Sequence, residues 1–143
     1  MAYSNIDELK KKIDETKLVQ LTDTGASGAI DTDKVDRAIQ EADAMINSFV
    51  GEVYFVPMNP VPNVIVDISA TLAILYLHRF RSVESAVWKE AELGALKYLG
   101  KIAEGEATLE GAIAEPAPSS DSSNSVTFTA SERRFSRDLL KDM

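Results

Sequence analysis

Residues 63–80 read NVIVDISATLAILYLHRF, and a helix drawn through them is apolar around most of its circumference. A helix of this length with so little polar surface has to be buried between other helices. We therefore expect this stretch to be the central helix of a mainly α protein. Its most apolar part, residues 68–77, is shorter than the roughly 18 residues that span a bilayer, so no membrane span is expected.

An amphipathic helix is expected before this stretch. Apolar residues recur at three- and four-residue steps from Val35 to Phe49, which is the helical period. Asp31 or Thr32 can cap its start, and Gly51 stands where a glycine would end it. Its polar face is predicted to hold Asp36, Arg37, Gln40, Glu41, Asp43 and Asn47.

The segments around these two helices are shorter or less regular. Three prolines exclude regular structure across 57–62, and residues 53–56 can form a brief extended segment. At the N-terminal side, a short helix is predicted within 4–13, capped by Ser4 or Asn5. It is followed by a small apolar cluster, Leu18, Val19 and Leu21, and by a loop at residues 23–28.

A last helix is predicted from a cap at Ser82 to about Glu104. Its Gly94 and Ala95 allow the close approach of a neighbouring helix. Its bulky contributions to the core are expected from Trp88, Leu93, Leu96, Tyr98, Leu99 and Ile102. The fold class is accordingly a small bundle of four to five helices with a short extended segment and an extended C-terminal arm.

Composition limits the possible chemistry. The chain has 143 residues, which suits one domain, and its lack of cysteine excludes disulfides, thiolate metal sites and thiol nucleophiles. The N-terminus has no apolar signal segment, so a cytosolic site of synthesis is expected. The net charge of −8 opposes general attraction to nucleic-acid backbones.

The composition changes toward the C-terminus and predicts three parts: a helical body at 1–111, a flexible linker at 112–125 and a docking arm at 126–143. The linker is rich in serine and proline and has too few large apolar side chains to repay its own ordering. The arm has four basic and three acidic residues. Residues 1–125 have eleven basic and twenty acidic residues, so the arm differs in charge from the rest of the chain. A frayed tail is the alternative. The arm's expected contact residues are Val126, Phe128, Arg133, Arg134, Phe135, Arg137 and Leu139.

Two acidic patterns have to be weighed against simple structural roles. Asp23-Thr24-Gly25-Ala26 is the catalytic tetrad of aspartic proteases, but those enzymes are rich in β structure, so a polar turn is the preferred interpretation. Asp31, Asp33 and Asp36, with Asp23, could supply oxygen ligands to calcium. They lack the spacing of an EF-hand loop, so helix capping is preferred and neither a metal nor a cofactor is expected.

The basic residues near the end of the central stretch complete the candidates. His78 is the only histidine, has no catalytic partner at motif spacing and is predicted to be structural. Arg79 and Arg81 are candidate interface residues, with ordinary solvation as the alternative. No Walker loop, nucleophile elbow or HExxH motif is present, so no catalytic residue is predicted and the protein is not expected to be an enzyme.

Several segments in order resemble the Mu-like phage and prophage neck proteins, which look related to the ring-forming head–tail adaptors of long-tailed phages. The resemblance covers nearly the whole chain, although Val53 stands where an arginine would be expected. The closing Phe-Ser-Arg-Asp element is the most distinctive part. The segments that carry the resemblance are 21–23, 30–31, the helix 35–49, 54–57, 66–70, the helix running through 97–99 to 102–105, and 135–139.

The resemblance implies a structural head–tail connector in the virion neck, assembled in the cytoplasm of the bacterial host. It would dock on the portal protein and other neck or tail proteins, self-associate into a ring of about twelve copies, and let DNA pass without sequence-specific binding. Two other hypotheses remain: an acidic helical binding module for a phage or host regulator, and a hydrolase built on Asp23.

Overall fold

The computed structural model describes residues 2–114, and these confirm a mainly α fold. Five helices follow one another: α1 (Ile6–Lys12), α2 (Glu15–Thr22), α3 (Thr32–Val50), α4 (Asn63–Phe80) and α5 (Ala86–Ala103). No named strand forms within 2–114, where extended pairing is limited to one antiparallel bridge between Tyr54 and Ala114. The predicted extended segment at 53–56 is thus reduced to a single bridge residue.

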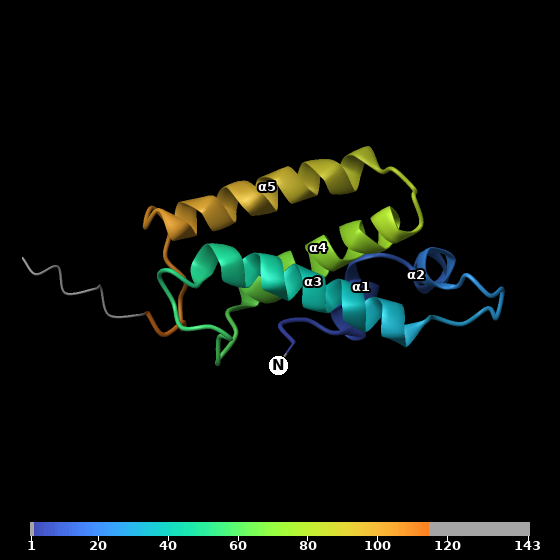
Figure 1. The fold of residues 1–143 in the computed structure, drawn as a ribbon, viewed down its shortest axis with the longest axis horizontal. Helices are drawn as coiled ribbons and strands as arrows, with labels where there is room; N and C mark the ends of the chain where they lie inside the picture. Colours follow the sequence, from blue (N-terminus) through green and yellow to red (C-terminus); the bar gives the residue numbers. More distant parts are fainter. Residues whose placement is uncertain (1, 115–143) are drawn as a thin grey trace, which may run out of the picture.

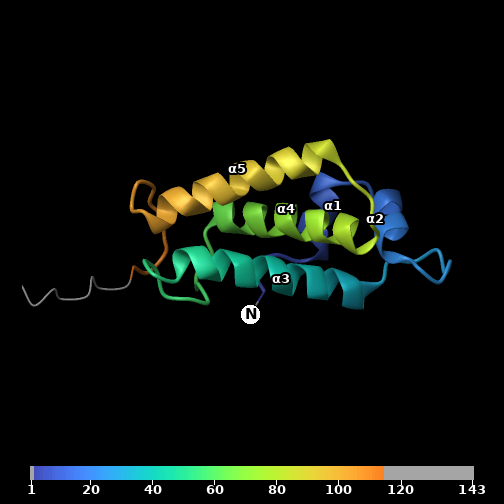
Figure 2. The ribbon, with the colours of Figure 1, turned by 45° about the horizontal axis from the view of Figure 1, so that its top comes forward.

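The central position of α4 is confirmed. It contacts each of the other four helices, with α3 and α5 lying along it and the short α2 near its C-terminal end (Figures 1 and 2). Lys12 at the end of α1 pairs with Asp67 in the N-terminal half of α4. By length and composition alone α4 is apolar enough to cross a membrane, but 67% of it is buried inside the bundle. That burial is what a core helix requires.

The ends of α1 and α3 follow from their sequence. Asn5 caps α1 by accepting a hydrogen bond from the Glu8 N–H, and Asp31 caps α3 by accepting from two N–H groups. Gly51 ends α3 as predicted, but with an ordinary helical φ of −66°. Its small size is needed because a Cβ there would lie 2.7 Å from the Asn47 carbonyl oxygen.

Two boundaries differ from the sequence prediction. The apolar cluster at Leu18 and Leu21, for which no helix was predicted, lies in the helix α2, and both side chains are on its buried face. Ser82 does not cap α5: its φ of 55° places it in the left-handed turn that ends α4, where its N–H reaches the Arg79 carbonyl. The Val83 N–H reaches the His78 carbonyl, which completes a Schellman motif, and α5 starts after Ser85.

The last helix is far less buried than expected. Only Leu99 and Ile102 of α5 are fully buried, and Leu93, which was predicted to be a core residue, is 67% exposed. Leu93 is not among the residues packed against the core, so its apolar character does not contribute to it. After α5 the chain turns back and residues 113–114 run beside Tyr54 and Phe55, where the Phe55 N–H donates to the Ile113 carbonyl.

Candidate interaction surfaces

The two arginines predicted as contact residues differ in their surroundings. Arg79 donates from one guanidinium nitrogen to both carboxylate oxygens of Glu92, at 2.9 and 2.8 Å, and lies 5.6 Å from the centre of the Tyr76 ring. It therefore joins α4 to α5. Arg81 is the exposed C-terminal cap residue of α4 and forms no ion pair with residues 2–114. Of the two, Arg81 is the one whose charge is available at the surface.

The remaining predicted contact residues lie outside the described part of the chain, as does the linker from residue 115 onward. Residues 112–114, which composition assigns to the linker, are tied to the body by the bridge to Tyr54. The predicted contact residues that lie outside the described part are Val126, Phe128, Arg133, Arg134, Phe135, Arg137 and Leu139.

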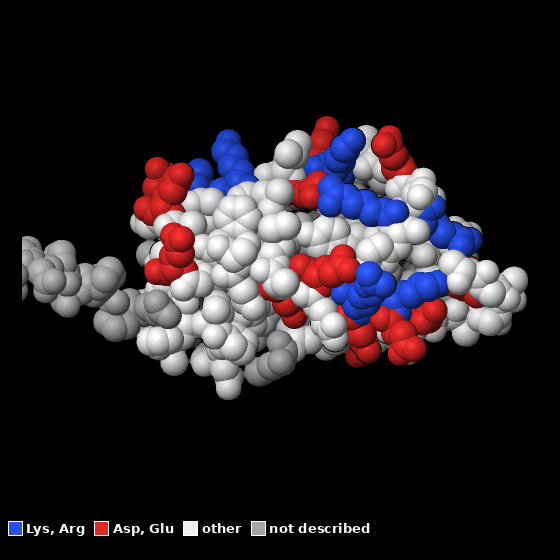
Figure 3. Space-filling view, in the orientation of Figure 1, with Lys and Arg blue, Asp and Glu red and all other residues white. Residues whose placement is uncertain are grey.

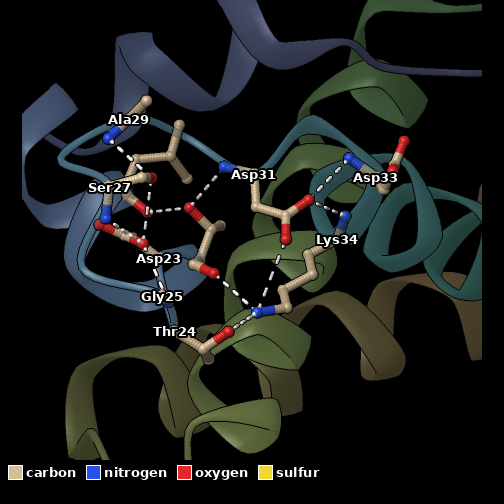
Figure 4. Close-up of polar contacts among 10 residues, drawn as sticks. Asp23, Thr24, Gly25, Ser27, Ala29, Asp31, Asp33 and Lys34 are labelled. Atoms are coloured by element: carbon tan, nitrogen blue, oxygen red, sulfur yellow. Dashed lines mark hydrogen bonds and ion pairs between the residues drawn. The ribbon is translucent and has the colours of Figure 1, made fainter.

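The Asp23 loop has the polar-turn structure that was preferred over a catalytic tetrad (Figure 4). The Asp23 carboxylate accepts hydrogen bonds from the N–H groups of Gly28, Ser27 and Gly25, at 2.7, 3.0 and 3.1 Å, and from the Ser27 hydroxyl. These bonds, that from Gly28 first, lower the pKa of Asp23. The carboxylate holds its own loop together at the surface.

Of the acidic residues weighed as calcium ligands, Asp31 is paired with Lys34 (Figure 4). The Lys34 ammonium donates to the Thr22 carbonyl and the Thr24 hydroxyl, at 2.8 and 2.7 Å, and lies 3.6 Å from Asp31. Asp31 accepts from the N–H groups of Asp33 and Lys34, which confirms its capping role. Within residues 2–114, no group of three or more acidic or histidine side chains is arranged to hold a metal ion.

His78 is buried in the last turn of α4. Its Nδ1 lies 2.8 Å from the Ile74 carbonyl oxygen, and its ring is 6.1 Å from that of Trp88 on α5. With Nδ1 engaged by the backbone and only 6% of the residue exposed, the side chain has the structural environment predicted for it.

A buried polar network around Asp43 was missed. Asp43 was assigned to the polar face of α3, but it is only 8% exposed and accepts hydrogen bonds from the Ser69 hydroxyl at 2.6 Å and the Tyr3 N–H at 2.8 Å. Burial raises the pKa of Asp43, and the bonds from Ser69 and Tyr3 oppose that rise. The signal was present in the sequence, because Asp43 is four residues after Ile39 and three before Ile46, which both face the core.

The same network fixes the N-terminal segment. The Tyr3 hydroxyl donates to Asn47 on α3 and accepts from the Met58 N–H, and the hydroxyls of Ser4 and Ser69 lie 2.7 Å apart. Every buried side-chain nitrogen and oxygen in residues 2–114 has a hydrogen-bond partner. The network therefore has the character of a structural clamp between the N-terminus, α3 and α4.

An open groove runs between α4 and α5. It consists of two cavities of about 500 and 390 Å3 that share Val64 and Tyr98. The first is formed by the loop before α4 and by residues 108–111, and the second lies along the two helices. The helical residues that line the second cavity are Lys12 of α1, Val64, Asp67, Ile68 and Thr71 of α4 and Trp88, Ala91, Gly94, Ala95 and Tyr98 of α5.

Exposed apolar side chains gather at the two ends of the bundle. The near end patch is formed by Phe55, Val56 and Ile113, which are 48%, 38% and 59% exposed. The far end patch follows the last turn of α4. It consists of Phe80, Val83 and Val87, which are 43%, 47% and 72% exposed.

Charges are distributed unevenly over the same surface. Figure 3 shows most acidic and basic side chains over the right-hand half and the upper edge, and a largely uncharged region in the lower left. The chain after α3 and the chain end at residue 114 both lie on that left side (Figure 1). Apolar contact in an uncharged region of this kind costs little desolvation of charges.

Comparison with known protein families places the chain. The family model described as Bacteriophage Mu, Gp36 matches residues 3–128, which is most of the chain and nearly all of the described structure. A search of curated proteins finds no match. The chain therefore belongs to the bacteriophage Mu Gp36 family and is a Mu-like phage protein.

Proposed function

We propose that this phage protein is a structural component of particle assembly, specifically a head–tail connector that docks on the portal protein and extends the DNA channel. The family match over residues 3–128 supports a role in the phage particle or its assembly.

The observation that carries the connector role is the separation of the two apolar patches. The near end patch and the far end patch are formed by different residues and lie at opposite ends of α4, whose 18 residues span about 27 Å. A subunit of a closed ring needs two different, complementary surfaces, because each copy contacts one neighbour with one surface and the next with the other. Two separated apolar patches meet that requirement.

The charge of the body fits passage of DNA through such a ring. Residues 2–114 contain eleven Lys and Arg and eighteen Asp and Glu, a difference of −7. A ring multiplies this charge by its copy number, and an acidic lumen repels the phosphate backbone. DNA would pass without adhering to the wall, and no sequence-specific contact is required.

Light scattering tests the proposal. The mass of the protein is measured alone and after mixing with the portal protein of the same phage. Recruitment of several copies to the portal, alone or with the next neck protein, is the expected result. Failure to associate with any head or tail component, together with one-to-one complexes with a regulator, would contradict the connector role and favour an acidic binding module.

Variants of the end patch sharpen the test. Phe55→Ser with Ile113→Ser removes apolar surface that is already exposed, so the bundle should fold while recruitment to the portal assembly falls. Leu93→Ser is the control, because Leu93 is a still more exposed apolar side chain that belongs to neither patch. Equal recruitment of the patch variant and the control would show that the near end patch is not an assembly surface.

Removal of residues 115–143 tests the docking arm separately. If residues 126–143 contact a neighbouring subunit or the portal, the shortened chain should be recruited more weakly than the full chain. Unchanged assembly would show that the arm is not needed.

A further inference from the structure

The groove between α4 and α5 is an apolar surface that the helices themselves leave open. Trp88 and Tyr98 stand along one side and Val64 and Ile68 along the other. A Cβ atom added to Gly94, at the floor, would meet no atom within 4 Å. Apolar area of this kind is stabilised by a partner that removes it from water.

We propose that residues 126–143 of the same chain occupy this groove, with Phe135 and Leu139 as the apolar anchors. These two residues are four apart, so a helical turn would present both on one side, as in recognition of an amphipathic helix by a groove. The arm thereby has a binding surface on its own body.

The position of the chain end makes this contact reachable. The groove begins at Gly111, three residues before Ala114, which is held beside Tyr54. The eleven residues of 115–125 span at most about 36–40 Å when extended. The eighteen residues of α5 are about 27 Å long, so the segment after residue 125 can reach any point along the groove.

Charge favours the same occupant. The body has a charge of −7, and the acidic residue that remains unneutralised at the groove is Glu110 at the first cavity, because Asp67 and Lys12 both line the second. Asp67 is already paired with Lys12 at 2.6 Å, whereas Glu110 forms no ion pair with residues 2–114. The segment 126–143 has a net charge of +1, with three arginines around Phe135. Complementary charge selects this segment over a second copy of the acidic body.

The proposal concerns the free chain and is independent of the connector role. A short linker holds the segment at an effective concentration in the millimolar range, so it would occupy its own groove before it meets any partner. Docking of the arm elsewhere would then require its release.

Fluorescence of Trp88 reports on the groove, because this is the only tryptophan of the chain and it lines the second cavity. The full chain is compared with the variant Phe135→Ser, Leu139→Ser, and with Ser136→Ala as a control in the same segment. The double variant should show clearly greater acrylamide quenching and a red-shifted emission, while the control matches the natural chain. Equal quenching in all three would overturn the proposal, provided that circular dichroism shows the same helix content.

Disulfide formation locates the contact, since the chain has no cysteine of its own. Gly94→Cys with Leu139→Cys should form an intramolecular disulfide at least about tenfold faster than Gly100→Cys with Leu139→Cys. Gly100 is a matched control, because a Cβ there also meets no atom within 4 Å but the residue does not line the groove. Equal rates would overturn the groove as the site, and disulfides only between chains would overturn docking on the same molecule.

Discussion

Helices α4 and α5 have the same length but differ in burial: α4 lies inside the bundle, whereas most of α5 is at least partly exposed to solvent. Each contains 18 residues, but twelve are buried in α4 and two in α5. The difference shows that α4 stabilises the fold, whereas much of the apolar surface of α5 is left for something else to cover. Substitutions in the two helices should therefore have different consequences, and the following predictions test this from the largest effect to the smallest.

The largest effect is expected for core truncation in α4. Leu72 is fully buried, so Leu72→Ala should lower the free energy of unfolding by about 2–5 kcal/mol. Leu93→Ala in α5 removes a side chain that is 67% exposed and should change it by less than about 0.5 kcal/mol. Urea unfolding measures both values. Similar losses would mean that α5 is covered in the intact protein.

The second largest loss of stability is expected in the polar network that joins Asp43 of α3 to Ser69 of α4. Asp43→Ala leaves the Tyr3 N–H without its acceptor and removes one partner of the Ser69 hydroxyl, which should cost about 1–3 kcal/mol. Asp43→Asn retains an acceptor oxygen and should cost less. Thermal unfolding of both variants gives the comparison, and equal losses would show that the hydrogen bonds at Asp43 contribute little.

A gain in stability is expected in α5. In a chain that ends at residue 114, Gly94→Ala places a methyl group in open space and replaces a poor helix former, so it should raise the free energy of unfolding by up to about 1 kcal/mol. Gly100→Ala should act in the same way. If Gly94→Ala lowers the free energy of unfolding of the full chain while Gly100→Ala raises it, another segment lies close to Gly94 over the groove. The loss at Gly94 should then disappear when residues 115–143 are removed.

The ion pair that joins the two helices should contribute less. A double-mutant cycle with Arg79→Met and Glu92→Gln should give a coupling of about 0.2–1 kcal/mol, because the Arg79 side chain is half exposed to solvent. Added salt should weaken the coupling. A coupling that is larger and insensitive to salt would indicate that this end of α5 is more buried than the fold of residues 2–114 shows.

The smallest effects are opposite dependences on pH at two aspartates. Burial raises the pKa of Asp43 above its unfolded value, so its contribution to stability is greatest in acid and falls as pH rises through the raised pKa. Hydrogen bonds from Gly28 and Ser27 lower the pKa of Asp23, so its contribution is present at higher pH and is lost as pH falls through the lowered pKa. Denaturant unfolding of Asp43→Asn and Asp23→Asn across the acid range should therefore differ from the natural chain with opposite slopes. Parallel profiles would contradict the assigned environments.

The helices could largely be predicted from sequence, whereas several helix boundaries could not. Apolar spacing and caps identify α3 and the burial of α4, since both depend on residues near one another in the chain. Ser82 was misassigned because a serine can cap a helix or end one, and only the path of the chain between α4 and α5 decides. The cluster at Leu18 is too short for its period to distinguish a helix from a loop.

The candidate surfaces were less predictable. Arg79 and Arg81 have the same residue type and lie two residues apart at the end of α4, but Glu92, thirteen residues after Arg79, engages only Arg79. The groove consists of small and aromatic residues that a sequence pattern assigns equally well to a core. Whether such residues are covered depends on how far apart two helices lie, which no single segment determines.

By itself the sequence determined the mainly α class, the buried central helix, the acidic body and the change in composition before the C-terminal segment. These properties follow from local period, capping and charge, each of which is a property of neighbouring residues. Only the tertiary structure decided that Asp43 is buried against Ser69, that Leu93 faces solvent and that a groove remains between α4 and α5. These depend on contacts between residues far apart in the chain, because packing, rather than period, sets which side of each helix meets another.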